Sequence, residues 1–278
     1  FVDKIKCPIY ATTFASKLIQ NRLNENKLNN RVDLKVINTK KTLKLKNFNL
    51  SFFETTHSIP ETYAIKIETQ YGNLLHTADW KIDNNPLIGK SFNSSNFKKI
   101  GDDGILALIG DSTNANTNGF SGSEIDVKNH LKKLFQRYSY RIVTTCFSSN
   151  IARIESIALA AKNNNRKVAI VGRSINRTIK IARECGYLNN VEEFVSQEEA
   201  EYIPRENLVI ICTGSQGEKR SALFRIAYNA HKYINLEKGD TVIFSSKDIP
   251  GNEKSINNLK NLLIRQKVEI ITSNEEMV

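Results

Sequence analysis

The chain has 278 residues, which is enough for one large domain or two ordinary ones. Its composition, 40% apolar and 25% charged, excludes a disordered chain, and no apolar run approaches the roughly 18 residues needed to cross a bilayer. The net charge is +11, and residues 1–50 carry 11 Lys and Arg against 3 Asp and Glu, whereas residues 51–120 carry 5 against 8. An acidic centre between basic segments suits a metal site approached by a polyanion, but charge alone is better explained as a solubilising surface.

The first 110 residues are expected to form short strands around one early helix. Residues 13–23 have the pattern of a helix, with Thr12 or Thr13 as its cap. Alternating or continuous apolar runs predict strands at 7–11, 35–46, 48–53, 63–69, 74–75 and 104–109, the last of them buried. This mainly antiparallel succession fits half of an αββα sandwich.

Two histidines and an aspartate follow the expected strands. His57 comes shortly after residues 48–53, and His76 and Asp79 come directly after residues 74–75. A neutral imidazole and a carboxylate are ligands that suit zinc or manganese, and a carboxylate can bridge two ions. For either histidine by itself, a buried structural role is the better interpretation.

Asp111 follows the apolar run 104–109 in the same way. A carboxylate at the end of a strand can orient a metal-ligating imidazole by accepting its second N–H. The alternative is a turn or helix cap formed by Asp111 and Ser112. The residues alone do not decide between the two.

The motifs around these positions resemble those of a known family. His57-Ser-Ile-Pro-Glu, His76-Thr-Ala-Asp79-Trp-Lys-Ile-Asp83 and Gly110-Asp111-Ser-Thr-Asn resemble motifs of the ribonuclease J family, in the β-CASP branch of the metallo-β-lactamase superfamily. The resemblance implies that His57 and Asp79 ligate metal, with Asp79 bridging two ions, and that Asp111 orients a ligand. These three are the catalytic residues that it implies, whereas His76 keeps a structural role.

From residue 123 onward, apolar strands alternate with helices. The expected strands are 141–147, 167–171, 208–212, 241–244 and 268–272, and the expected helices end near residues 163, 185, 233 and 265. This alternation predicts a mostly parallel α/β sheet covered on both faces, as in a Rossmann-like fold. Ligands bind such sheets at the carboxyl ends of the strands, where loops meet helix N-termini.

Four loops at those strand ends consist mainly of Ser, Gly, Thr and Asn. A tight turn explains any one of them, but four loops on one edge, one with an arginine, favour a phosphate-binding surface. Residues 214–217 lack the spacing of a dinucleotide fingerprint. The loops also resemble those of the ribonuclease J family, so that the resemblance covers essentially the whole chain. The candidate substrate-binding residues are Ser148, Asn150, Arg173, Ser174, Ser215, Gln216 and Ser246.

The chain also departs from the family pattern. Ala78 stands where the family usually has glycine, Trp80 where it has phenylalanine, and Lys219-Arg220 where it has Pro-Met. The family's His-x-His-x-Asp-His motif is absent, and the sequence stops before its His-x-Ser-Gly-His motif. We therefore expect an internal portion of a ribonuclease J, with the later part of the metallo-β-lactamase domain in residues 1–122 and most of the β-CASP domain in residues 123–278.

The activity that the resemblance implies is that of a metal-dependent ribonuclease with 5′–3′ exonuclease and endonuclease modes, in RNA processing and mRNA decay. It implies two Zn²⁺ ions per complete active site, with Mn²⁺ or Mg²⁺ as alternatives. It also implies RNA as the partner, a homo-oligomer (dimer or tetramer), a cytoplasmic location and no membrane. With two metal ligands, the chain alone is expected to be inactive. Two alternatives remain, a non-catalytic RNA-binding module and a small-molecule hydrolase of the metallo-β-lactamase type.

The cysteines give an expectation about the redox compartment. The chain has four, Cys7, Cys146, Cys185 and Cys212, and none of them forms a Cys-x-x-Cys pair. Widely spaced cysteines without metal-ligand spacing are typical of reduced, buried thiols in a cytoplasmic protein.

Overall fold

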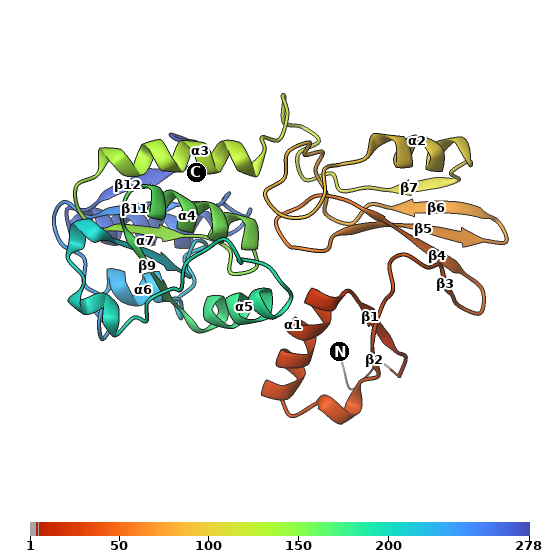
Figure 1. Ribbon diagram of the computed structural model, residues 1–278, viewed down its shortest axis with the longest axis horizontal. Helices are drawn as coiled ribbons and strands as arrows, with labels where there is room; N and C mark the ends of the chain where they lie inside the picture. The colour runs from red at the N-terminus through yellow and green to blue at the C-terminus, as the bar shows by residue number, and fades with distance from the viewer. Residues whose placement is uncertain (1–3, 5) are drawn as a thin grey trace. The chain divides into compact units, whose positions relative to one another are not determined.

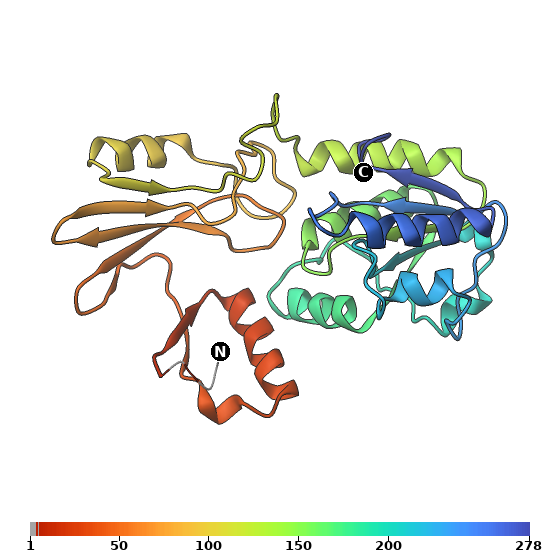
Figure 2. The same ribbon diagram turned by 180° about the vertical axis from the view of Figure 1, so that it is seen from behind.

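The computed structural model describes residue 4 and residues 6–278 (Figures 1 and 2). The chain divides into two compact units, residues 1–123 and residues 124–278, which we call unit 1 and unit 2. In the part of the chain that the structure describes, no helix is both long enough and apolar enough to cross a membrane.

Unit 1 contains a five-stranded sheet. Its strands lie in the order β3 (Leu43–Lys44), β4 (Asn49–Glu54), β5 (Tyr63–Thr69), β6 (Gly72–His76), β7 (Ala107–Ile109). The first four strands are antiparallel neighbours, whereas β7 pairs in parallel with β6. Because β5 runs opposite to both of its neighbours, β4, β6 and β7 all point the same way. The loops that follow these three strands therefore leave the sheet at one edge.

The parallel pairing of β7 depends on a helix that the sequence pattern did not predict. α2 (Ser94–Asp102) connects β6 with β7, and its first turn is capped by Asn93, whose side chain accepts from the N–H groups of Ser95 and Asn96. Ile100 of this helix packs against the sheet residues Ala64 and Leu75. α2 thus covers one face of the sheet.

The prediction of a buried strand at 104–109 was wrong about burial. β7 is an edge strand, and all three of its residues are exposed. Leu108 retains 63% and Ile109 retains 50% of its accessible surface. A continuous apolar run predicts a strand with two covered faces. Among the described residues, however, β7 pairs with β6 alone, and its side chains are left uncovered.

A β–α–β element stands at the start of unit 1. β1 (Ile9–Ala11) and β2 (Leu34–Val36) pair in parallel, and α1 (Thr13–Glu25) confirms the helix expected there. The Thr12 side chain makes no capping hydrogen bond. Instead, the Glu61 carboxylate accepts a hydrogen bond of 2.8 Å from the Phe14 N–H, which is one of the donors that a helix start leaves without an intrahelical partner.

Unit 2 has the parallel sheet that the sequence predicts. Its strands lie in the order β12 (Glu269–Thr272), β11 (Thr241–Phe244), β8 (Ile142–Thr145), β10 (Leu208–Cys212), β9 (Lys167–Val171). All four pairings are parallel, so the loops after β8, β9, β10 and β11 leave at one edge. The connection from β8 leads to β9, which lies on one side of β8. The connection from β10 leads past β8 to β11, which lies on its other side. β8 therefore stands at a topological switch point, beside which ligands bind in open α/β sheets.

Helices cover both faces of this sheet. They are α3 (Glu124–Leu134), α4 (Ile151–Asn163), α5 (Arg173–Glu184), α6 (Ala222–Ala227), α7 (Glu253–Arg265). α4 lies in front of the sheet in Figure 1 and α7 in Figure 2. Residues of α6 and α7 join those of the strands in one buried core, which includes Leu223, Ile256 and Leu263.

Two expectations about these helices need correction. The alternating pattern did not reveal α3, which carries residues 124–134. The helix expected to continue to about residue 233 ends at Ala227. It ends there because Asn229 adopts a left-handed conformation with φ of 52°, and the N–H of Ala230 turns back to the carbonyl of Arg225.

The expectation of four buried thiols holds for two cysteines only. Cys146 and Cys212 are buried, Cys185 is half-buried and Cys7 is exposed, and all four are free thiols. Burial raises the pKa of Cys146 to about 12, so this thiol stays protonated at neutral pH.

Candidate functional site

Hydrogen bonds from Thr77 join two of the three loops at the edge of the unit 1 sheet. The Thr77 side chain is fully buried, and its Oγ1 accepts a hydrogen bond of 3.1 Å from the Asp111 N–H. The Thr77 N–H donates to the carbonyl of Ile109 at 3.0 Å. Thr77 therefore fixes the start of the loop that carries Asp79 against the start of the loop that carries Asp111.

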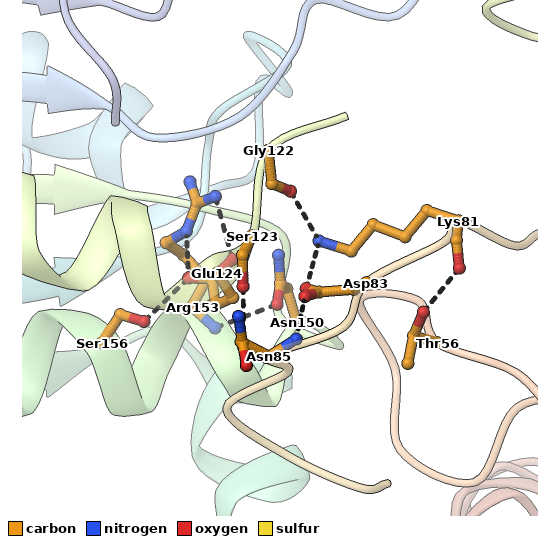
Figure 3. Close-up of polar contacts among 10 residues, drawn as sticks. All are labelled: Thr56, Lys81, Asp83, Asn85, Gly122, Ser123, Glu124, Asn150, Arg153 and Ser156. Carbon is orange, nitrogen blue, oxygen red and sulfur yellow. Dashed lines mark hydrogen bonds and ion pairs between the residues drawn. The ribbon is translucent and has the colours of Figure 1, made fainter. Parts of the chain in front are cut away.

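Thr56, which precedes His57, joins the loop after β4 to the loop after β6. The Lys81 N–H donates to the Thr56 carbonyl at 2.9 Å, and the Thr56 hydroxyl donates to the Lys81 carbonyl (Figure 3). The ammonium of Lys81 lies 3.2 Å from Asp83, which is buried. Burial acts to raise the pKa of Asp83, but hydrogen bonds from Ser123, the Asn85 N–H and Lys81 outweigh it and hold that pKa below its usual range. A buried, ionised Asp83 thus anchors the loop.

His57 lies within electrostatic range of both predicted carboxylates. Burial of the imidazole lowers the pKa of His57, and the negative charges of Asp79 and Asp111 oppose that effect while Lys81 adds to it. The Ser58 hydroxyl lies 3.2 Å from Nδ1 of His57. His57 is therefore coupled electrostatically to both predicted carboxylates, and its lowered pKa favours the neutral imidazole.

Asp111 is held in place by its own loop. Its carboxylate accepts hydrogen bonds from the hydroxyl of Thr113 at 2.6 Å and from the Thr113 N–H at 2.9 Å. These bonds lower the pKa of Asp111, against a small opposing effect of burial, and the Trp80 N–H and His57 lower it further. This is the turn geometry that sequence reasoning kept as the alternative for Asp111, and its proximity to His57 leaves an orienting role open as a proposal.

His76 occupies a structural position. Its Nδ1 accepts a hydrogen bond of 3.0 Å from the Ala78 N–H, so its neutral tautomer carries the proton on Nε2. Neither ring nitrogen then offers a free lone pair to a metal ion. Ala78 has a φ of 53°, in the left-handed region that glycine adopts without strain. This explains physically why a glycine is expected at this position.

The donor set of unit 1 falls short of a complete metal site. Within residue 4 and residues 6–278, no group of three or more His, Cys, Asp and Glu side chains is arranged to hold a metal ion. A catalytic zinc ion is usually held by three protein ligands. His57 and Asp79 are suitable ligands by chemistry, but they do not suffice by themselves, and we derive no step through a metal ion.

In unit 2, the predicted substrate-binding residues follow β8, β9, β10 and β11 and lie at the carboxyl edge, but they differ in exposure. Arg173 and Ser174 are exposed at the start of α5. Ser148 and Asn150 are half-buried, and the Asn150 side chain caps α4 by accepting from the Arg153 N–H at 3.0 Å. The remaining three residues are buried: Ser215, Gln216, Ser246.

Gln216 holds the neighbouring loop in place. Its amide N–H₂ donates to the carbonyl of Lys247 at 3.0 Å, and its amide oxygen accepts from the Ile249 N–H at 2.9 Å. The Asn252 side chain lies 3.3 Å from the same oxygen. Gln216 thus joins the loop after β10 to the loop after β11, and a contribution to ligand binding would act through the shape of this edge.

Sequence reasoning missed a buried ion pair that lies beneath the same loops. Arg153 donates to both carboxylate oxygens of Glu124, at 2.7 and 3.2 Å (Figure 3). It also donates to the carbonyl and hydroxyl of Ser245. Ser156 adds a hydrogen bond to Glu124 at 2.8 Å. An arginine at the third position of α4, just after the capping residue Asn150, was the available signal. The pair connects α3, α4 and the loop after β11.

Comparison with known proteins supports this description. Residues 139–263 match the family model described as "Ribonuclease J, beta-CASP domain". A crystal structure of a protein of unknown function from Enterococcus faecalis V583 matches with a TM-score of 0.65 at 12% identity, over 96% of this chain and 64% of that one. At that identity, the likeness shows the fold alone.

Curated relatives match along nearly the whole chain. Ribonuclease J of Sinorhizobium meliloti is 40% identical, over 99% of this chain and 49% of the relative. Ribonuclease J2 of Bacillus subtilis is 34% identical, over 97% and 49%, and ribonuclease J of Thermus thermophilus is 37% identical, over 92% and 45%. The chain spans about half the length of these relatives. Residues 139–263 therefore match the β-CASP domain of the ribonuclease J family, and the chain is similar to members of that family over nearly its whole length.

Proposed function

We propose that the chain is the RNA-binding part of a ribonuclease, and that RNA binds at the carboxyl edge of the unit 2 sheet. The names of the relatives supply the substrate class, since each is called a ribonuclease. The observation that carries the proposal is the convergence of four loops at one edge, where Arg173 and Ser174 are exposed. A guanidinium, hydroxyl groups and backbone N–H groups recognise phosphate without reading base sequence.

The exposed and the buried residues at this edge have different roles in the proposal. Arg173 and Ser174 contact the phosphates, with Ser148 and Asn150 beside the switch point. The buried residues Ser215, Gln216 and Ser246 act by keeping the loops in shape. RNA affinity should then depend on the exposed side chains directly and on the buried ones through stability.

The catalytic part of the proposal concerns unit 1. His57 and Asp79 would serve as metal ligands, and Asp111 would orient a ligand in an active site with two Zn²⁺ ions, or with Mn²⁺ or Mg²⁺. Bound metal ions would activate water and stabilise the leaving oxygen of a phosphodiester. The electrostatic coupling of His57 to Asp79 and to Asp111 supports this assignment. We further propose a cytoplasmic location and a homo-oligomer, a dimer or a tetramer.

The chain as it stands should bind RNA without cutting it. Its described residues lack a three-ligand metal group, so metal would be held too weakly to survive dialysis. The phosphate-facing edge lies in unit 2, whose core is built from apolar side chains and needs no metal. A non-catalytic RNA-binding module is therefore the second candidate for this chain.

Arg173→Ala tests the proposed RNA contact. We expect weaker binding to all single-stranded RNA sequences alike, with the slope of log K against log salt reduced by about 0.7, because one phosphate contact is lost. The measurement is fluorescence anisotropy with two oligonucleotides of different sequence at several salt concentrations.

The matched control is Arg265→Ala, which removes an exposed arginine at the end of α7, before β12 and so at the amino edge of the sheet. Its slope should equal that of the unsubstituted chain. Equal slopes for Arg173→Ala and Arg265→Ala would contradict the assignment of Arg173. An effect on one sequence only would show that Arg173 reads a base.

A further inference from the structure

The loop after β10 ends in a turn that presents two cations. The Ser221 N–H donates to the carbonyl of Glu218 at 2.9 Å, which closes a turn with Lys219 and Arg220 at its two central positions. Both side chains are exposed. These residues were not among the predicted substrate-binding residues.

The loop that carries the turn is closely packed at its start. Gly214 and Gly217 have φ of 129° and 71°, and the Gly217 N–H donates to the Gly214 carbonyl at 3.1 Å. A Cβ on Gly217 would lie 2.5 Å from the backbone of Ser255 in α7, so the loop packs directly on that helix. The turn is therefore fixed before any ligand arrives, which limits the entropy lost on binding.

The two cations also lack a neutralising partner. The carboxylate of Glu218 accepts from the Gln216 N–H at 3.1 Å, and within the described residues neither Lys219 nor Arg220 makes an ion pair. Other cations of unit 2 do, including Arg183 with Glu193 and Arg205 with Asp240. Adjacent like charges without a partner favour a polyanion as a ligand.

The turn belongs to the same edge as Arg173. β9 and β10 pair in parallel with Val171 opposite Cys212, so the loops after them start at the same level. They also touch, because a Cβ on Gly172 would lie 2.8 Å from Oγ1 of Thr213. Arg173 and the turn are thus carried by neighbouring loops on one edge of the sheet.

We propose that Lys219 and Arg220 form a second phosphate-binding element, which extends the RNA contact of Arg173 along the carboxyl edge of unit 2. The inference rests on the proposed function and deepens it, since it assigns two residues at which the chain departs from the family pattern. The partner is the backbone of single-stranded RNA, because solvated cations on a turn recognise charge and spacing without base edges. Three cations on two loops would then follow successive phosphates.

The test is the double variant K219A/R220A, compared with K238A/R265A. Lys238 and Arg265 are an exposed lysine and arginine that precede β11 and β12 at the amino edge, so the control removes the same charges from the opposite side. Both variants are titrated, beside the unsubstituted chain and Arg173→Ala, with a single-stranded RNA oligonucleotide at several salt concentrations. Thermal unfolding of each variant shows whether the fold is retained.

We expect K219A/R220A to reduce the salt slope by about 1.4, which is twice the value for one contact, and to weaken binding about 25-fold at 0.1 M salt. K238A/R265A should keep the slope of the unsubstituted chain. An unchanged slope for K219A/R220A, while Arg173→Ala reduces it, would overturn this inference and leave the proposed function intact. Absence of RNA binding by the unsubstituted chain would overturn both. If K219A/R220A unfolds, the salt slope is measured instead for K219Q/R220Q, which removes both charges but keeps polar side chains. The same two outcomes then support or overturn the inference.

Discussion

Replacing Arg153 with alanine is expected to destabilise unit 2 by about 3–5 kcal/mol, because it leaves the carboxylate of Glu124 buried without its guanidinium. The Arg153 side chain is 12% exposed and that of Glu124 is 10% exposed, so the carboxylate has little contact with solvent in the folded chain. Figure 3 shows the pair. The variant also removes two hydrogen bonds to Ser245, at the start of the loop after β11. RNA binding should fall with the fraction of folded unit 2.

The measurement is urea unfolding followed by far-UV circular dichroism and by tryptophan fluorescence. The single tryptophan, Trp80, lies in unit 1, so a circular dichroism transition that leaves the fluorescence unchanged reports unit 2. Arg265→Ala should change that transition by less than about 0.5 kcal/mol. The double variant E124L/R153M, which removes both charges, should recover at least half of the loss. If the double variant is as unstable as Arg153→Ala, the ion pair does not stabilise unit 2 in this way.

Gly217→Ala should destabilise unit 2 by about 2–5 kcal/mol, for two additive reasons. Gly217 has a φ of 71°, where an L-residue costs about 1–2 kcal/mol. Its new Cβ would also lie 2.5 Å from the carbonyl carbon of Ser255, and overpacking of this kind costs about 1–3 kcal/mol. The backbone of α7 cannot yield as a flexible side chain would.

Gly186→Ala separates the two contributions. Gly186 has a φ of 85°, close to that of Gly217, but nothing lies within 4 Å of a Cβ placed there. This control should therefore lose only the backbone part, about 1–2 kcal/mol. Circular dichroism unfolding of both variants gives the comparison. Equal losses of unfolding free energy in the two variants would show that the new contact with α7 does not add to the destabilisation.

The periodic pattern predicted most of the fold, because buried strands and amphipathic helices repeat with different periods. It failed where a local feature overrides the period. α6 ends at Ala227, since Asn229 takes a left-handed conformation, although apolar residues continue. The sequence pattern did not predict α2, because this helix is short and mainly polar and its one buried residue is Ile100. Neither a left-handed residue nor a single buried side chain produces a periodic signal.

The candidate site shows a similar limit. The family resemblance implied the roles of His57, Asp79 and Asp111, and these roles remain a prediction. The strand order adds that the loops carrying them leave the sheet at one edge, where His57 is electrostatically coupled to both carboxylates. Residue type could not predict exposure, however. Gln216 and Arg173 both follow parallel strands, yet Gln216 is buried in hydrogen bonds and Arg173 is exposed. Which side chain faces inward depends on how each loop packs on its neighbours.

The role of Arg153 could not be predicted for the same reason. Its partner Glu124 lies 29 residues away in sequence, and its other partner Ser245 lies 92 residues away. No local spacing encodes such contacts, which exist only once the parallel sheet has brought α3, α4 and the loop after β11 together.

The most direct test of the central claim is an RNA titration of the metal-free chain. After dialysis against a chelator, the chain is titrated with a fluorescent single-stranded RNA oligonucleotide between about 50 and 200 mM salt, with and without the chelator. We expect binding whose log K falls by about 2 per unit of log salt, as Arg173, Lys219 and Arg220 together require, with no effect of the chelator and no cleavage of the RNA. Absence of binding at the lowest salt concentration, or binding that the chelator abolishes, would contradict it.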